Sequence, residues 1–132
     1  MPGIKNDPLF PKGAVMSRFT IYHNPRCSKS RQTLAILEAH DIQPDIVLYL
    51  ENTPSKSTLQ KLLKQLELKP RDLLRRTEDA YKDKGLDNPD LSDASLLQAM
   101  IDEPRLIERP IVVKGNKAVL GRPPENVLGL IK

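Results

Sequence analysis

The residue best suited to do chemistry is Cys27, the one cysteine among 132 residues. It follows the turn-forming pair Asn24-Pro25 and directly precedes a helical pattern that begins at Ser28. The free backbone N–H groups and the dipole at the start of a helix favour a thiolate over a thiol. The same N–H groups form a site for an anion. A lone cysteine is commonly inert packing, but this position predicts a reactive nucleophile beside an anion site.

The residues around Cys27 narrow the kind of thiol site. Basic side chains lie within four positions of it on both sides, namely His23, Arg26, Lys29 and Arg31. A thioredoxin-type dithiol needs a second cysteine where Ser30 stands, and a tyrosine-phosphatase loop needs an arginine where Thr33 stands. Monothiol glutaredoxins use Cys-x-x-Ser, so that class stays open. One cysteine and two histidines do not suffice for a metal site, and no metal is expected.

Strands and helices alternate on both sides of this cysteine. Arg18–Tyr22 is rich in strand-forming residues, Ser28–His40 has a helical pattern, and Asp45–Leu50 is apolar enough to lie inside a sheet. Ser55 is a good N-cap for a helix with one buried face. The leucines of that face follow the i, i+3, i+4, i+7 spacing: Leu59, Leu62, Leu63 and Leu66.

Two more helices are predicted before the chain returns to strands. Pro70 opens a short helix that runs through Arg76, because proline suits the first helical turn. Ser92 caps another helix, which stops at Pro104.

A hairpin and a last helix complete the pattern. Pro110–Val113 and Lys117–Leu120 are predicted strands joined by Gly115-Asn116, a pair typical of a type II′ turn. Pro123 and Pro124 then open the final helix.

The order β-α-β, several helices and β-β-α is the layout of the α/β thioredoxin-like fold. The two strands that flank the first helix should be parallel and the hairpin antiparallel, which gives a four-stranded mixed sheet. The helices between Ser55 and Pro104 would form an insertion that covers one side. Residues 1–17 contain three prolines, two glycines and no apolar period, so they are predicted to be a disordered tail or leader before one domain, 18–132.

Composition excludes several function classes. The net charge of +4 is spread along the chain, and the aromatic residues are three tyrosines and two phenylalanines. Nucleic-acid binders usually concentrate charge in a stripe with aromatic residues between, so no nucleic-acid partner is expected. No apolar run approaches the roughly 18 residues that span a bilayer, and no secretory signal precedes the domain. We therefore expect no membrane partner and a cytoplasmic location, where a single unpaired thiol stays reduced.

Several segments in order resemble the ArsC-type, glutaredoxin-dependent arsenate reductases. That family pairs a thioredoxin-like core with a helical insertion, and the likeness covers the chain from about Phe19 to its end. The segments are His23–Arg31, Leu48–Asn52 with Pro54, Asp72–Arg75, Ile107–Val113 and Gly121–Pro123.

The resemblance implies a reaction on a tetrahedral oxyanion. In the family, the cysteine attacks arsenate to form a thiol–arsenate adduct, glutathione attacks the adduct, glutaredoxin resolves the mixed disulfide, and arsenite leaves. Glutathione is thus a co-substrate and no cofactor stays bound. The three arginines that hold the oxyanion fall here on Arg75, Arg109 and Arg122. Planar guanidinium groups offer paired donors that match the oxygens of arsenate.

A cis proline is expected beside the thiol. Thioredoxin-like folds commonly carry one at the start of the strand that begins at Pro110, and it would aim Arg109 at Cys27. Two supporting residues are predicted as well. His23 either lowers the pKa of the thiol or fixes the loop. Ser30 either donates a hydrogen bond to the thiolate or merely fills a helical position.

Simpler roles exist for the arginines. Arg75 and Arg76 suit two solvated charges on a helix, and the motif favours Arg75 as the one that faces the site. The simpler role of Arg109 is an ion pair with Glu108 or Glu103. The simpler role of Arg122 is to hold the C-terminal helix in place.

Three functions are therefore compared. The first is a glutathione- and glutaredoxin-dependent arsenate reductase. The second is a monothiol oxidoreductase that acts on glutathione adducts, which leaves the three arginines without a purpose. The third is a non-enzymatic partner-binding protein with an ordinary thiol. Family members often have Gly-Thr after the cysteine, where Ser28-Lys29 stands here, and the family's RNA-polymerase-binding regulators use a Cys-x-x-Cys switch that Ser30 rules out.

Overall fold

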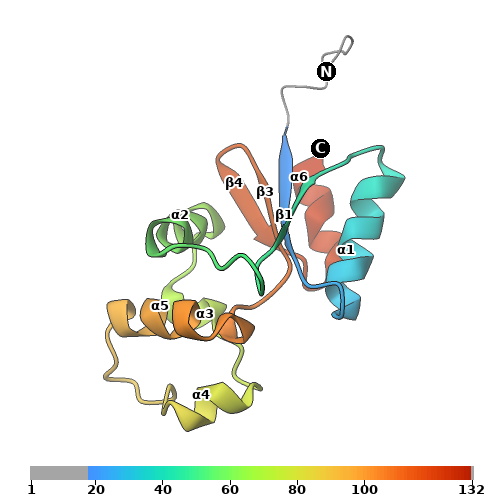
Figure 1. The fold of residues 1–132 in the computed structure, drawn as a ribbon. Helices are drawn as coiled ribbons and strands as arrows, with labels where there is room; N and C mark the ends of the chain where they lie inside the picture. The colour runs from blue at the N-terminus through green and yellow to red at the C-terminus, as the bar shows by residue number, and fades with distance from the viewer. Residues whose placement is uncertain (1–17, 132) are drawn as a thin grey trace.

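The computed structural model describes residues 18–131, and the predicted tail at 1–17 lies outside them (Figure 1). Four strands form one sheet in the order β2-β1-β3-β4. β1 is parallel to β2 and antiparallel to β3, and β3 is antiparallel to β4, as predicted for the thioredoxin-like fold. The strands span Phe19–His23 (β1), Asp45–Leu48 (β2), Ile111–Lys114 (β3) and Lys117–Leu120 (β4).

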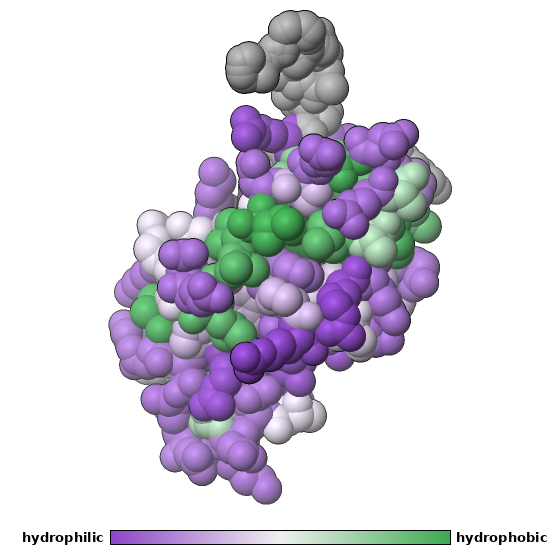
Figure 2. Space-filling view, turned by 45° about the vertical axis from the view of Figure 1, so that its right-hand side comes forward, coloured by the Kyte–Doolittle hydropathy of each residue, from purple (hydrophilic) through white to green (hydrophobic). Residues whose placement is uncertain are grey.

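The prediction that 45–50 lies inside the sheet is wrong. β2 is an edge strand that pairs only with β1 among the described strands, and Ile46 is 49% exposed. The strand also ends at Leu48, because the N–H groups of Glu51 and Asn52 both donate to the Leu48 carbonyl in a turn. Exposed apolar side chains therefore lie on this strand and just after it, at Ile46 and Leu50. Figure 2 shows apolar residues gathered on one face of the molecule, bordered by strongly hydrophilic ones.

One face of the sheet packs against α1, Ser28–Ala39, and the C-terminal helix (Figure 1). The C-terminal helix begins as a 3₁₀ turn, Pro124–Val127, and continues as α6, Leu128–Ile131. The predicted final helix is thus present, but its first turn is tighter than an α-helix. The buried core between these elements consists of Phe19, Ile21, Leu37, Val112, Val127 and Leu130.

The predicted helical insertion covers the other face and extends beyond the sheet (Figure 1). It contains α2 Lys56–Leu66, α3 Pro70–Leu73, α4 Asp79–Asp83 and α5 Asp93–Asp102, and α5 leads into a 3₁₀ turn, Pro104–Leu106. Ser55 and Ser92 cap α2 and α5 as predicted, each accepting a backbone N–H at 3.2 Å. No helix among residues 18–131 has both the length and the apolar character needed to cross a membrane.

The segment after α3 differs from its prediction. The helix that begins at Pro70 ends at Leu73 instead of reaching Arg76, because Leu74 leaves the helix to form a β-bridge with Ile107. The Arg75 N–H donates to the Leu106 carbonyl at 2.7 Å, in line with this pairing. Extended backbone pairing therefore replaces helical periodicity here, and it brings Arg75 beside the segment that leads into β3.

Gly121, which directly follows β4, permits a close approach to Thr33 of α1 and to Pro110. A Cβ atom at this position would lie 2.8 Å from Pro110 Cγ and closer still to Thr33 Oγ1. We expect Gly121→Ala to lower the free energy of unfolding by about 1–3 kcal/mol through overpacking. Gly129→Ala is the control, because a Cβ there meets nothing within 4 Å. Urea unfolding compares the two variants, and equal stability would contradict this account of Gly121.

Candidate active site

Cys27 is the N-cap residue of α1 and its thiol is free and partly exposed. The loop that carries it is held by local bonds. The Cys27 N–H donates to the Asn24 carbonyl at 3.0 Å, and the Arg26 N–H donates to Asn24 Oδ1 at 3.0 Å. This Asx turn joins β1 to α1 and presents the sulfur at the first turn of the helix.

A buried contact between His23 and Ser30 fixes this loop to the helix. Their side chains meet at 2.7 Å between His23 Nδ1 and Ser30 Oγ, and the Asn24 N–H donates to Ser30 Oγ at 3.0 Å. The structure shows no hydrogen bond from the Ser30 hydroxyl to Cys27 among the described residues, so donation to the thiolate stays a prediction. The alternative that Ser30 merely fills a helical position is wrong, since its side chain ties β1 to α1. Of the two roles considered for His23, the contacts favour fixing the loop.

The burial of His23 predicts a pH dependence of stability. Burial first, and the charge of Arg31 second, hold the pKa of His23 below its ordinary value, against an opposing effect of Glu38. Below about pH 6.5, His23 therefore binds a proton more readily in the unfolded chain than in the folded one. We expect the free energy of unfolding to fall as the pH drops through this window. Urea unfolding at several pH values tests this: the fall should shrink in His23→Gln and persist in His40→Gln, a change at an exposed histidine. An unchanged fall in His23→Gln would contradict it.

The surroundings of Cys27 favour its thiolate. Burial raises the pKa of the thiol, but the Ser30 N–H, the charge and hydrogen bond of Arg109, and the Lys29 N–H together outweigh burial. The net pKa of Cys27 therefore lies below its ordinary value. The sulfur forms no cap hydrogen bond, yet the dipoles of the Ser30 and Lys29 N–H groups still favour its thiolate. The predicted activation of this cysteine thus has two sources, the helix start and Arg109.

Arg109 approaches the thiol from the start of β3. The Arg109-Pro110 peptide bond is cis, as predicted, and Arg122-Pro123 is a second cis bond that was not predicted. The Arg109 Nε atom is buried and has no hydrogen-bond partner among residues 18–131. A buried N–H donor beside a nucleophile is suited to an incoming anion.

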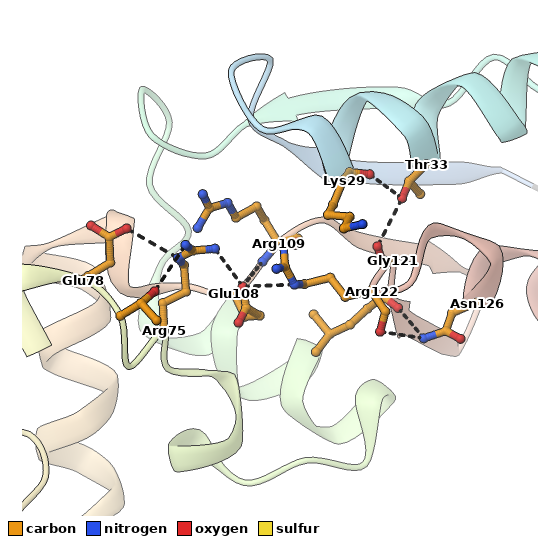
Figure 3. Close-up of polar contacts among 11 residues, drawn as sticks. Lys29, Thr33, Arg75, Glu78, Glu108, Arg109, Gly121, Arg122 and Asn126 are labelled. Carbon is orange, nitrogen blue, oxygen red and sulfur yellow. Dashed lines mark hydrogen bonds and ion pairs between the residues drawn. The ribbon is translucent and has the colours of Figure 1, made fainter.

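Glu108 gathers the three predicted arginines, although they come from three distant segments (Figure 3). Its Oε1 atom lies 3.1 Å from Arg75 Nη1 and 3.7 Å from Arg122 Nε. The Arg109 N–H is 3.4 Å from the same oxygen, and Arg122 Nη1 donates to the Arg109 carbonyl at 3.4 Å. The Glu108 carboxylate thus meets the side chains of Arg75 and Arg122 but only the backbone N–H of Arg109. These three residues are called the arginine cluster here.

The structure also distinguishes among the simpler roles for these arginines. Arg75 lies in the cluster with 17% of its side chain exposed, whereas Arg76 is exposed, and this contrast favours Arg75 as the one that faces the site. Glu103 pairs with Arg105 at 2.9 Å instead of with Arg109. Arg75 Nε is 3.4 Å from Glu78 Oε2, close enough for an ion pair but not aligned as a hydrogen bond. This second buried Nε therefore adds a donor to the cluster.

Tyr49 is a site residue that the sequence reasoning missed. Its ring is buried just after β2, and burial raises the pKa of Tyr49 to about 12. Smaller effects come from Arg109 and Arg75, which lower this pKa, and from Cys27 and Glu108, which raise it. It stays protonated at neutral pH and can donate a hydrogen bond. The signal was available, because parallel β1 and β2 end at one edge of the sheet, and Tyr49 directly follows β2 there.

Comparisons with known proteins agree with this geometry. The model of the ArsC family matches residues 22–130. The arsenate reductase of Haemophilus influenzae is 51% identical over 112 residues, which are 84% of this chain and 97% of that protein. An Escherichia coli K12 protein described as uncharacterised is 52% identical over 84% of this chain and 94% of its own. The solved structure of the arsenate reductase from Vibrio cholerae is 49% identical, with a TM-score of 0.84 over 86% of this chain and 97% of that one.

Proposed function

Because this chain belongs to the ArsC family, we propose that it is an arsenate reductase in which Cys27 attacks arsenate bound by the arginine cluster. The observation that carries the proposal is that the pKa of the Cys27 thiol is lowered by the charge of Arg109, an arginine whose buried Nε has no hydrogen-bond partner among the described residues. A buried cationic donor without a hydrogen-bond partner is costly, and an anion bound next to the nucleophile would accept its hydrogen bond. Arsenate supplies both the negative charge and an electrophilic arsenic atom.

The first chemical step joins sulfur to arsenic. The Cys27 thiolate attacks the arsenic atom, an As–O bond breaks, and the departing oxygen leaves as water after protonation. The arginine cluster holds the remaining oxygens and offsets the charge that gathers on them. Tyr49, which is protonated at neutral pH and whose pKa responds to the charges of Cys27 and Arg109, is a further donor to these oxygens.

The reduction itself requires an external thiol, because the chain has no second cysteine. Glutathione attacks the adduct and forms a disulfide with Cys27. The electron pair of the S–As bond stays on arsenic, which goes from As(V) to As(III) and leaves as arsenite. Glutaredoxin then reduces the mixed disulfide and restores the thiol. These reductants place the reaction in the cytoplasm, where thiols are kept reduced.

A coupled assay tests the proposal. NADPH oxidation is followed with arsenate, glutathione, glutathione reductase and glutaredoxin, and each component is omitted in turn. We expect saturable activity that needs arsenate, glutathione and glutaredoxin together. Turnover of a glutathionylated substrate without any need for arsenate would favour the monothiol oxidoreductase instead. Absence of both activities in the folded protein would reject both enzymes.

A further inference from the structure

Glu108 puts a negative charge in the middle of a site for an anion. Its Oε1 atom takes the contacts of Arg75, Arg122 and the Arg109 N–H, at 3.1, 3.7 and 3.4 Å. Its Oε2 atom has no hydrogen-bond partner in the part of the chain that the structure describes. This second oxygen is not among the fully buried unpartnered atoms, and the Glu108 side chain is 24% exposed.

A carboxylate at this position is unfavourable for a simple anion. Two negative groups a few ångströms apart repel each other, and an ionised carboxylate can only accept hydrogen bonds. Only an oxyanion that carries its own proton turns this repulsion into attraction, by donating an O–H to the carboxylate. Near neutral pH, arsenate and phosphate carry such a proton, whereas sulfate has the same shape and charge but none.

We propose that Glu108 is the specificity-determining residue of the site, accepting the proton of a hydrogen-bearing tetrahedral oxyanion through Oε2 and excluding sulfate. The inference rests on the proposed function, because it assigns the same site to the oxyanion. It extends that function by explaining why a carboxylate lies among three arginines. Glu108 directly precedes Arg109, accepts its backbone N–H, and Arg109 is the arginine whose charge lowers the pKa of Cys27.

The ability of anions to protect Cys27 from alkylation tests the inference without turnover. Iodoacetamide modifies the only cysteine, so an anion at the site slows the reaction. Half-protecting concentrations of phosphate and sulfate are measured near neutral pH at constant ionic strength. We expect the wild type to prefer phosphate by roughly tenfold or more, as expected for one hydrogen bond to a charged group. Glu108→Gln should remove most of this preference, because an amide can donate to sulfate and accept from phosphate.

Glu78→Gln is the matched control, since it removes the same charge from another partner of Arg75. It should keep the preference for phosphate. If Glu108 only held the arginines in place, its loss would weaken the binding of phosphate and sulfate equally. The ratio of their half-protecting concentrations would then stay unchanged. An unchanged ratio in Glu108→Gln, or a wild type that does not discriminate, would overturn the inference.

These outcomes are separable from those of the proposed function. Arsenate reduction together with an unchanged anion ratio in Glu108→Gln would support the proposed function and contradict the inference about Glu108. Discrimination between the anions through Glu108 without arsenate reduction would support the inference and contradict the proposed function.

Discussion

Cys27→Ser is expected to abolish arsenate reduction and to leave the fold intact. A serine hydroxyl is not ionised at neutral pH, so the variant lacks the nucleophile that begins the reaction. The variant should be as stable as the wild type, because the native thiol forms no cap hydrogen bond and serine is among the preferred N-cap residues. The coupled assay should fall to its background rate while urea unfolding gives a free energy at or above that of the wild type.

The comparison has a clear opposing outcome. Activity of Cys27→Ser within about tenfold of the wild type would mean that another group performs the chemistry, because nucleophile loss costs far more than this. Loss of activity together with loss of folding would be inconsistent with the predicted role of serine as a cap. The partner-binding alternative predicts no arsenate-dependent activity in either protein.

Arg109→Ala is expected to lower kcat/KM for arsenate on the order of 10²-fold. This fall corresponds to a loss of about 2–4 kcal/mol of transition-state stabilisation. The charge of Arg109 lowers the pKa of Cys27, and its buried Nε has no hydrogen-bond partner among the described residues, so it is expected to act on both reacting partners. The same change should raise the pKa of Cys27, because the charge of Arg109 lowers it. The pH profile of alkylation by iodoacetamide should therefore move to higher pH.

Arg76→Ala is the control for this prediction. It removes the same side chain from an exposed position that makes no contact with the arginine cluster in the described structure. Its kcat/KM and its alkylation profile should match those of the wild type. Equal activity of Arg109→Ala and the wild type would remove Arg109 from the site, whereas a large loss in Arg76→Ala would mean that the wrong neighbour of Arg75 was chosen.

Local signals in the sequence were sufficient for the position of Cys27 and the layout of the sheet. The turn at Asn24-Pro25 and the helix start at Ser28 are encoded within a few residues. They place the thiol at the N-cap of α1 as predicted. The strand pattern and the turn at Gly115, which adopts a φ of +60°, likewise lead to the observed hairpin.

Features set by long-range pairing were beyond the sequence patterns. Leu74 forms a bridge with Ile107, a contact that periodicity cannot reveal and that ends the helix early. The exposure of Ile46 depends on which strand occupies the edge of the sheet, and an apolar run does not encode that order.

The polar contacts of the site were the hardest to foresee. The Ser30 hydroxyl was considered as a donor to the thiolate or as helix filler, whereas the structure shows it in contact with the buried ring of His23. Glu108 was considered only as a partner of Arg109, whereas its carboxylate also meets Arg75 and Arg122. An acidic residue next to a predicted anion-binding arginine is the signal that would have identified it.

The most direct test of the central claim is the mass of the protein after incubation with arsenate and glutathione in the absence of glutaredoxin. The account predicts one glutathione attached to Cys27, formed when arsenate is present and not when phosphate replaces it. Release of that glutathione on addition of glutaredoxin should accompany renewed turnover. A glutathione adduct that forms equally without arsenate, or no adduct at all in a protein that turns over, would contradict the account.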